Sequence, residues 1–175
     1  TELAGAATGD IEMRGAGAAH ATAIRVNGRN IVTPSFTAAI AEGNISIATL
    51  FGVPRPEGQV KLAKARIGGQ RFDSATVTAK ATGANTYRTA VKLAGPDLSL
   101  DADAVVTPGS SGARYAVSRL AGKLRGIPFS ASAPLVLQQA GETVTLEPAR
   151  LAIGKGNIRV GGRLLPDLKA TVTVQ

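Results

Sequence analysis

Cysteine and tryptophan are absent from this chain of 175 residues, and histidine and methionine occur once each. Without cysteine no disulfide framework can hold the fold, and one histidine cannot form a metal site of the usual His or Cys types. Two tyrosines and four phenylalanines are the aromatic residues. Because aromatic rings supply much of the bulk of a compact core, a thick globular core would be hard to fill, and a thin layered structure is expected.

Long hydrophobic segments are missing as well. No apolar run approaches the roughly 18 residues of a membrane span, and the N-terminus does not resemble a signal peptide. The chain does not begin with Met. We therefore expect a segment of a longer protein, with any membrane anchor outside it.

The main positive signal is an alternation of apolar and polar residues, which places side chains on opposite faces of a strand. The alternation is clearest in four stretches, residues 97–104, 119–125, 158–164 and 168–174. Each stretch is predicted to be a half-buried strand.

Glycine, proline and asparagine interrupt such stretches at short intervals, as β-turns require. The expected turns are Asn27-Gly28, Gly43-Asn44, Gly68-Gly69, Gly83-Ala84-Asn85, Gly95-Pro96, Pro108-Gly109, Gly126, Gly141, Gly154 to Gly156, and Pro166. Their spacing predicts about fifteen short strands of an all-β protein. The Ala-rich stretch from Phe36 to Ala41 leaves a short helix open, because helix and strand are hard to separate in short apolar runs.

About fifteen strands exceed the roughly ten that an open sheet tolerates before it curls, splits or flattens. We therefore expect an all-β, elongated curved sheet that forms a U-shaped groove, similar to a β-taco or β-solenoid, with an apolar interior. An ordinary β-sandwich core would give the same alternation and remains open. No linker divides the chain, so residues 1–175 are expected to form a single β-groove segment. The side chains predicted to line the groove are Val91, Leu93, Leu98, Leu100, Leu124, Phe129, Ile158, Val160, Leu164, Leu168, Val172 and Val174.

The formal net charge of +8 raises nucleic acid or anionic lipid as partners. The tightest groups among the 20 basic residues are Lys61, Lys64, Arg66 and Arg71, and then Arg119, Lys123 and Arg125. A solvated basic outer face is the simpler interpretation. The aromatic residues are too scattered to interleave with cations as nucleic-acid surfaces require, so no nucleic acid is expected as a partner.

Candidates for catalysis are few. His20 has no acidic neighbour in sequence to orient it as a general base. Asp97, Asp101 and Asp103 share one strand face, and paired carboxylates can hydrolyse glycosides or bind calcium, but a solvated strand face has the same pattern. The pair Gly154-Lys155 lacks the phosphate-loop spacing. We expect no catalytic residue, no metal site and no cofactor.

Three successive stretches resemble a unit that recurs in the TamB family, the inner-membrane subunit of the translocation and assembly module and an AsmA-like β-groove protein. They are Leu120 to Phe129 followed by Ala133 to Leu135, then Leu146 to Gly156, and then Ile158 to Leu164. The stretch Ile67 to Val77 has a similar composition and pattern. The resemblance covers residues 58–174 and is looser over residues 1–57. Each motif alone is a common β-turn sequence, and the resemblance rests on the order in which the motifs occur.

The resemblance implies a large periplasmic protein of a Gram-negative bacterium, anchored in the inner membrane outside this segment. It implies the Omp85-type outer-membrane barrel TamA as partner, and a role in outer-membrane biogenesis, lipid transport and protein secretion. The segment would be a hydrophobic conduit or holder for phospholipid or for unfolded outer-membrane protein strands. The family brings no catalytic residues to carry over.

Two alternatives remain. A structural or adhesive β-solenoid, such as an autotransporter passenger, would have a closed and dry interior. A β-helical polysaccharide enzyme would need a cleft with clustered carboxylates or basic residues. Fold alone does not decide among the three.

Overall fold

The computed structural model describes residues 4–16, 20–34, 36–49, 55–67, 69–167 and 169–174. These residues form strands and no helix, so no helix long and apolar enough to cross a membrane occurs in the described ranges. The strands are β1 (Ala4–Arg14), β2 (Ala21–Val32), β3 (Phe36–Ala48), β4 (Arg55–Ile67), β5 (Gln70–Ala81), β6 (Tyr87–Ala94), β7 (Leu98–Pro108), β8 (Gly112–Leu124), β9 (Ile127–Ala131), β10 (Leu135–Ala140), β11 (Thr143–Ile153), β12 (Gly156–Leu165) and β13 (Lys169–Val174).

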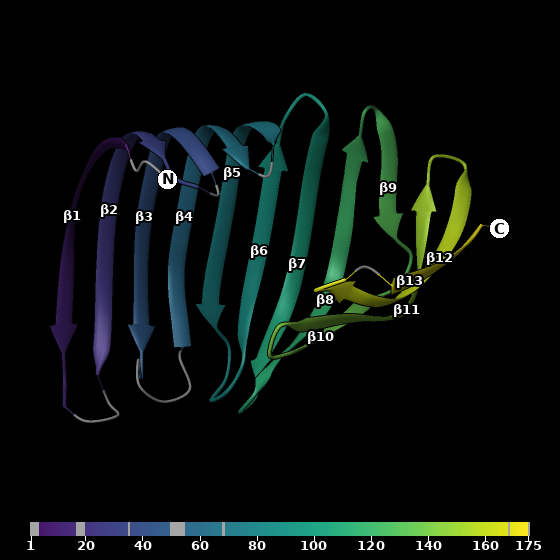
Figure 1. The fold of residues 1–175 in the computed structure, drawn as a ribbon. Coiled ribbons are helices and arrows are strands. Elements are labelled where there is room, and N and C mark those ends of the chain that lie inside the picture. The colour runs from purple at the N-terminus through teal and green to yellow at the C-terminus, as the bar shows by residue number, and fades with distance from the viewer. Residues whose placement is uncertain are drawn as a thin grey trace.

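The 13 strands belong to one antiparallel sheet, whose order follows the chain from β1 to β8 and then continues through β10, β11, β12 and β13 (Figure 1). Strands β9 and β10 share one position between β8 and β11, since β10 pairs with the first part of β8 and β9 with its last part. Except at β9 and β10, each strand pairs with the next strand along the chain. The expected all-β, elongated curved sheet is confirmed.

The sheet is a single layer, and its surface area shows this. The accessible surface is 11141 Å², whereas a compact monomer of this mass exposes about 7,900 Å². The fully buried hydrophobic side chains are few and mostly small, with Ala38, Ala65, Ala75 and Ala104 among them. A thin fold suits the many alanines and the scarcity of aromatic residues.

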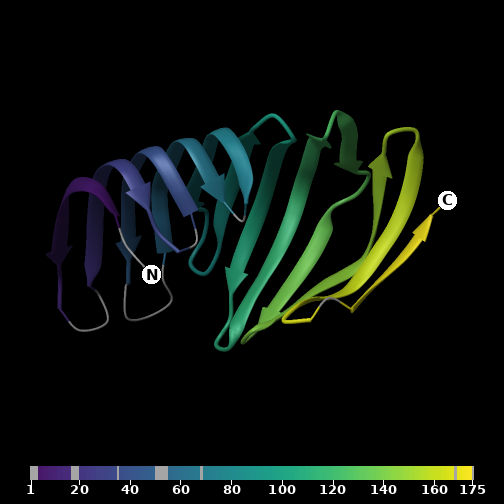
Figure 2. The same ribbon diagram turned by 45° about the horizontal axis from the view of Figure 1, so that its top comes forward.

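A corner crosses the N-terminal half of the sheet, where β1 to β5 bend sharply (Figures 1 and 2). The corner row is marked by breaks in the pairing: Ala38 pairs with Ala65 and Ile40 with Ala63, and the residues between them are skipped. Asn30 (φ 52°) and Lys64 (φ 47°) adopt the left-handed conformation in this row. A left-handed residue redirects a strand.

The segments beyond the corner, here called the hook, are the described residues of 31–38 and 65–72. The hook bends toward the face on which Gly28 lies, because a β-carbon on Gly28 would stand only 2.9 Å from Cδ1 of Ile31. Phe72 in the hook is only 5% exposed. The bend therefore gives the N-terminal half of the sheet its trough-like cross-section.

Two expected turns are wrong. Asn27-Gly28 and Gly43-Asn44 lie inside β2 and β3, where Asn27 pairs with Glu42 and Val26 with Gly43. Pairing on both sides of each strand outweighs the local turn preference, so the sheet has 13 strands instead of about fifteen. The helical alternative for Phe36 to Ala41 is also wrong, because this stretch begins β3 and pairs with both β2 and β4. Gly68 of the expected Gly68-Gly69 turn lies outside the described residues.

Candidate functional site: the concave apolar face

Direct cross-strand partners lie on the same face of a sheet, so the register shows which side chains gather on each side. Leu93 of β6 pairs with Leu100 of β7, and Leu100 pairs with Gly122 of β8. Gly122 pairs in turn with Phe129, which pairs with Ile153 of β11. This face, toward which the hook bends, is called the concave face, and the opposite side the convex face.

The predicted groove residues gather on the concave face. The register places there Val91, Leu93, Leu98, Leu100, Leu124, Phe129, Ile158, Val160, Val172 and Val174. Neighbouring pairs among them are Leu98 with Leu124 and Val160 with Val172. Leu164 is half-buried at an irregularity, since Leu165 pairs with Val144 and Arg163 with Thr145. Leu168 lies outside the described residues.

The same face continues across β1 to β5, which the predicted set of groove residues does not include. Ile11, Ile24 and Ile45 form one cross-strand row, and Val60 and Val77 pair further along. The alternation was present here too, for example in Ile45-Ser46-Ile47. The glycines inside β2 and β3, whose local preference is for turns, obscure it.

The concave face carries no charged side chain on the described strands. Outside the hook, the register places each paired Asp, Glu, Lys or Arg on the convex face, as for Asp101 and Lys92. Lys64 lies at the corner row, and Glu147, at a register irregularity, accepts a hydrogen bond from Gln138 of the convex face. The face is also partly uncovered, because Ile11 is 71% and Val172 57% exposed. A continuous apolar strip thus remains accessible on a sheet without a second layer.

An apolar recess of about 390 Å³ lies on the concave face across β6, β7, β8, β10 and β11. Its walls include Val91, Ala102, Val117, Leu137 and Val144. The polar groups at its edge are engaged within the protein: the Thr89 hydroxyl donates to the Thr78 carbonyl at 2.9 Å and the Tyr115 hydroxyl donates to Gln139 Oε1 at 2.8 Å. The recess therefore offers hydrocarbon contact and few free hydrogen-bond partners.

Tyr87 lies on the concave face in the row of Val106 and Tyr115. Burial raises the pKa of the Tyr87 hydroxyl, and the charge of a neighbouring Tyr115 adds to the rise. The Tyr87 hydroxyl is therefore neutral at ordinary pH. The two tyrosines are the aromatic residues with a hydroxyl on this face. They supply a few polar atoms to an otherwise apolar wall.

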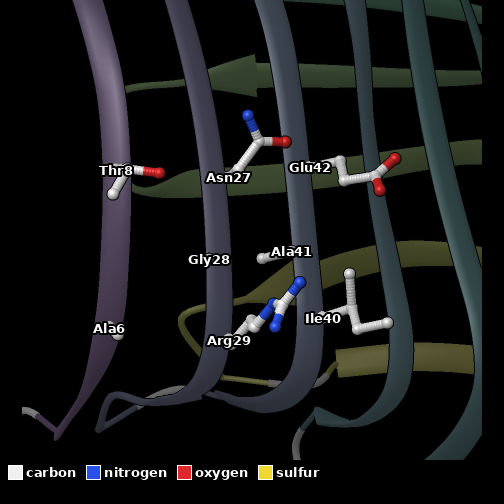
Figure 3. A pocket seen from close by; sticks show the side chains of 8 residues that line it. All are labelled: Ala6, Thr8, Asn27, Gly28, Arg29, Ile40, Ala41 and Glu42. Atoms are coloured by element: carbon white, nitrogen blue, oxygen red, sulfur yellow. The ribbon is translucent and has the colours of Figure 1, made fainter.

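A second hollow, of about 420 Å³, is polar and lies across β1, β2 and β3. Thr8, Asn27 and Glu42 stand side by side on three neighbouring strands (Figure 3). Glu42 is the one carboxylate among its lining residues, and its partner on β4 is Lys61. The hollow lacks the paired carboxylates that glycoside hydrolysis requires.

The other chemical candidates are dispersed. Asp101 and Asp103 lie on the convex face, where Asp101 Oδ2 is 3.2 Å from Nη2 of Arg119. His20 is half-buried just before β2. No group of three or more potential ligands for a metal ion occurs in the described part of the chain.

The fold and the apolar face together define a single-sheet β-groove protein. Comparisons of the chain with protein-family models, with curated proteins and with solved structures gave no match.

Proposed function

We propose that this chain is a passive hydrophobic conduit or holder, which shields apolar chains from water along its concave face. The observation that carries the proposal is the accessible apolar strip, free of charged residues on the described strands, that runs from Ile11 on β1 to Val174 on β13. Burying methylene groups contributes about 0.8 kcal/mol each. A wall of modest aliphatic side chains can therefore bind hydrocarbon without a specific polar contact.

The cargo in this proposal is a phospholipid acyl chain or an unfolded outer-membrane protein strand. The resemblance to the TamB family supports this choice, and so would place the full protein in the periplasm, anchored in the inner membrane, with TamA as partner. The recess beside Val91 and Leu137 is an apolar site for an acyl chain, and its volume of about 390 Å³ lies in the usual range of ligand pockets.

The two alternative functions would each require a different interior of the fold. An adhesive β-solenoid would be closed and dry, whereas the described strands form one open sheet. A polysaccharide enzyme would need clustered carboxylates, and Asp101 and Asp103 lie among the cations Lys92 and Arg119 on the convex face. The open apolar face favours the conduit.

Mass spectrometry of lipids that co-purify with the chain tests the proposal. We expect phospholipid at near-stoichiometric amounts, and its displacement by an excess of a long-chain fatty acid. A Leu137→Asp variant, which places a carboxylate in the recess, should lose the lipid while keeping its β-sheet circular dichroism. A lipid-free chain that also fails to bind apolar fluorescent probes and unfolded β-strand peptides would contradict the proposal.

A further inference from the structure

Opposite charges face each other at four cross-strand rows of the convex face. The register pairs Asp10 with Arg25, Glu42 with Lys61, Lys92 with Asp101, and Asp103 with Arg119. Such cross-strand pairs are stabilising, whereas like charges directly opposite each other are destabilising. At these four rows the charges are therefore balanced by the protein's own side chains.

Strands β11, β12 and β13 break this rule twice. Arg150 lies directly opposite Arg159, and Arg163 lies directly opposite Lys169. The two rows are four residues apart on β12, which is about 13 Å along a strand. Two like-charged pairs also occur on β4 to β6, at Arg66 with Arg71 and at Lys80 with Arg88, but these rows are nine residues apart on β5, so the rows of β11 to β13 lie closer together.

None of these four cations has an acidic partner within ion-pair distance among the described residues. Within the described part of the chain, the ion pairs join Glu12 to Arg14 and Asp101 to Arg119. The acidic neighbour on β11 is Glu147, whose Oε1 accepts a hydrogen bond from Gln138 Nε2 at 2.9 Å. Arg150, Arg159 and Lys169 are exposed, and Arg163 is half-buried.

We propose that the convex face of β11 to β13 docks on an anionic phospholipid bilayer surface. Charge complementarity supports this docking, because four cations that the register holds opposite like charges gain most from an external array of anions. Each basic residue near such a surface strengthens binding about five-fold. The inference does not depend on the conduit function of the opposite face.

A single-stranded nucleic acid is the competing polyanion. Surfaces that bind it combine cations with aromatic side chains on which bases stack. No aromatic residue lies on this convex patch, because Phe129 and both tyrosines belong to the concave face. A lipid surface needs only the cations.

Vesicle flotation tests the docking surface with the whole chain. Wild-type protein should bind vesicles of phosphatidylethanolamine and phosphatidylglycerol, and release as salt is raised. The double variant Arg159→Gln/Lys169→Gln removes one cation from each pair and should lower the partition coefficient about 25-fold. The matched control Lys61→Gln/Arg119→Gln loses the same charge from balanced rows and should fall less than about five-fold.

Thermal unfolding supplies a second readout. Because the double variant removes repulsion, its midpoint should equal or exceed that of the wild type, while the control should be unchanged or lower. Equal loss of vesicle binding in both variants overturns the proposal. So does equal binding to phosphatidylcholine vesicles, or binding to a single-stranded oligonucleotide that exceeds binding to the anionic vesicles. A double variant with a lower unfolding midpoint than the wild type would show that the paired cations do not repel each other, and the proposal would lose its basis.

Discussion

The ring of Phe129 on β9 lies over Gly122 on β8, where a β-carbon would come within 2.7 Å of the ring Cζ atom. The same β-carbon would stand 2.1 Å from the Ser99 carbonyl oxygen. Glycine at this position lets the concave face close around an aromatic side chain, as aromatic residues do over sheet glycines elsewhere. The contact fixes β9 against β8 at the end of the groove.

Replacing Gly122 by alanine should destabilise the sheet. The added methyl group must displace backbone or the Phe129 ring, and overpacking of this kind costs about 1–3 kcal/mol. Urea unfolding measures the change. The control is Gly43→Ala, where the nearest atom to a new β-carbon is Val26 Cβ at 4.0 Å, and the expected change is within about 0.5 kcal/mol. Similar losses in both variants would contradict the packing described for Phe129.

The corner depends on left-handed residues. Asn30 has φ of 52°, which asparagine and glycine tolerate and β-branched residues do not. Asn30→Val should lower the free energy of unfolding by about 1–2 kcal/mol, whereas Asn30→Gly should be nearly neutral. Thr78, an extended position on β5, offers a control, since valine is favoured in ordinary strands. If Asn30→Val and Thr78→Val changed the free energy of unfolding in denaturant by the same amount, the corner would not need a left-handed residue at position 30.

Thr22 is the one buried polar side chain on the concave face of the N-terminal strands that the structure describes, with its Oγ1 unpartnered and 6% of the residue exposed. An unsatisfied buried hydroxyl is costly, so the isosteric Thr22→Val should raise the free energy of unfolding by about 1 kcal/mol. Thr89→Val is the matched control, because it removes the 2.9 Å hydrogen bond to the Thr78 carbonyl and should lose about 1 kcal/mol. A lower free energy of unfolding for Thr22→Val would show that the Thr22 hydroxyl has a partner in solution.

A charge on the concave face should interrupt the apolar strip. Val160→Asp and Leu100→Arg are expected to reduce binding of an apolar fluorescent probe at least about ten-fold, given the cost of desolvating an unpaired charge. Asn157→Asp adds the same charge as Val160→Asp on the convex side of β12 and should bind normally. Circular dichroism establishes that each variant is folded. Full transport or client passage in cells with folded Val160→Asp would contradict the conduit.

Alkaline pH should weaken the fold through Tyr87. Burial, with help from Tyr115, raises the pKa of Tyr87 above its ordinary value of 10.0. A group whose pKa is higher in the folded state contributes its full stabilisation of the fold below the pKa of the unfolded state. That stabilisation is lost as pH rises through the pKa of the folded state. Stability should therefore fall above about pH 10. Tyr87→Phe should flatten this fall, and the tyrosinate absorbance of the folded wild type should appear later than in the unfolded chain.

Much of the architecture could be predicted because alternation is a local signal. Leu98 to Ala104 and Ile158 to Gly162 lie in the strands, and on the faces, that the alternation indicated. The local alternation does not predict that the glycines of β2 and β3 lie inside strands. Gly28 and Gly43 belong to strand interiors because β1, β3 and β4 pair beside them, and such pairing is not visible in a short window.

The hook and the like-charged patch were likewise beyond the sequence pattern. Lys64 gives no local sign that it bends its strand, and the arginines at 150 and 159 are nine positions apart, with a turn at Gly154 between them. The turn and bulges set the register that brings them opposite each other. Sequence counts showed an excess of positive charge, and only the register located it.

By itself, the sequence determined that the chain forms successive half-buried strands with one apolar face, because side-chain direction in a strand depends only on whether a position is odd or even. The tertiary structure decided where the sheet bends, that the apolar face stays open, and which charges meet across strands. These features depend on pairing between distant residues, since a shift of one residue in register moves every side chain of a strand to the opposite face of the sheet.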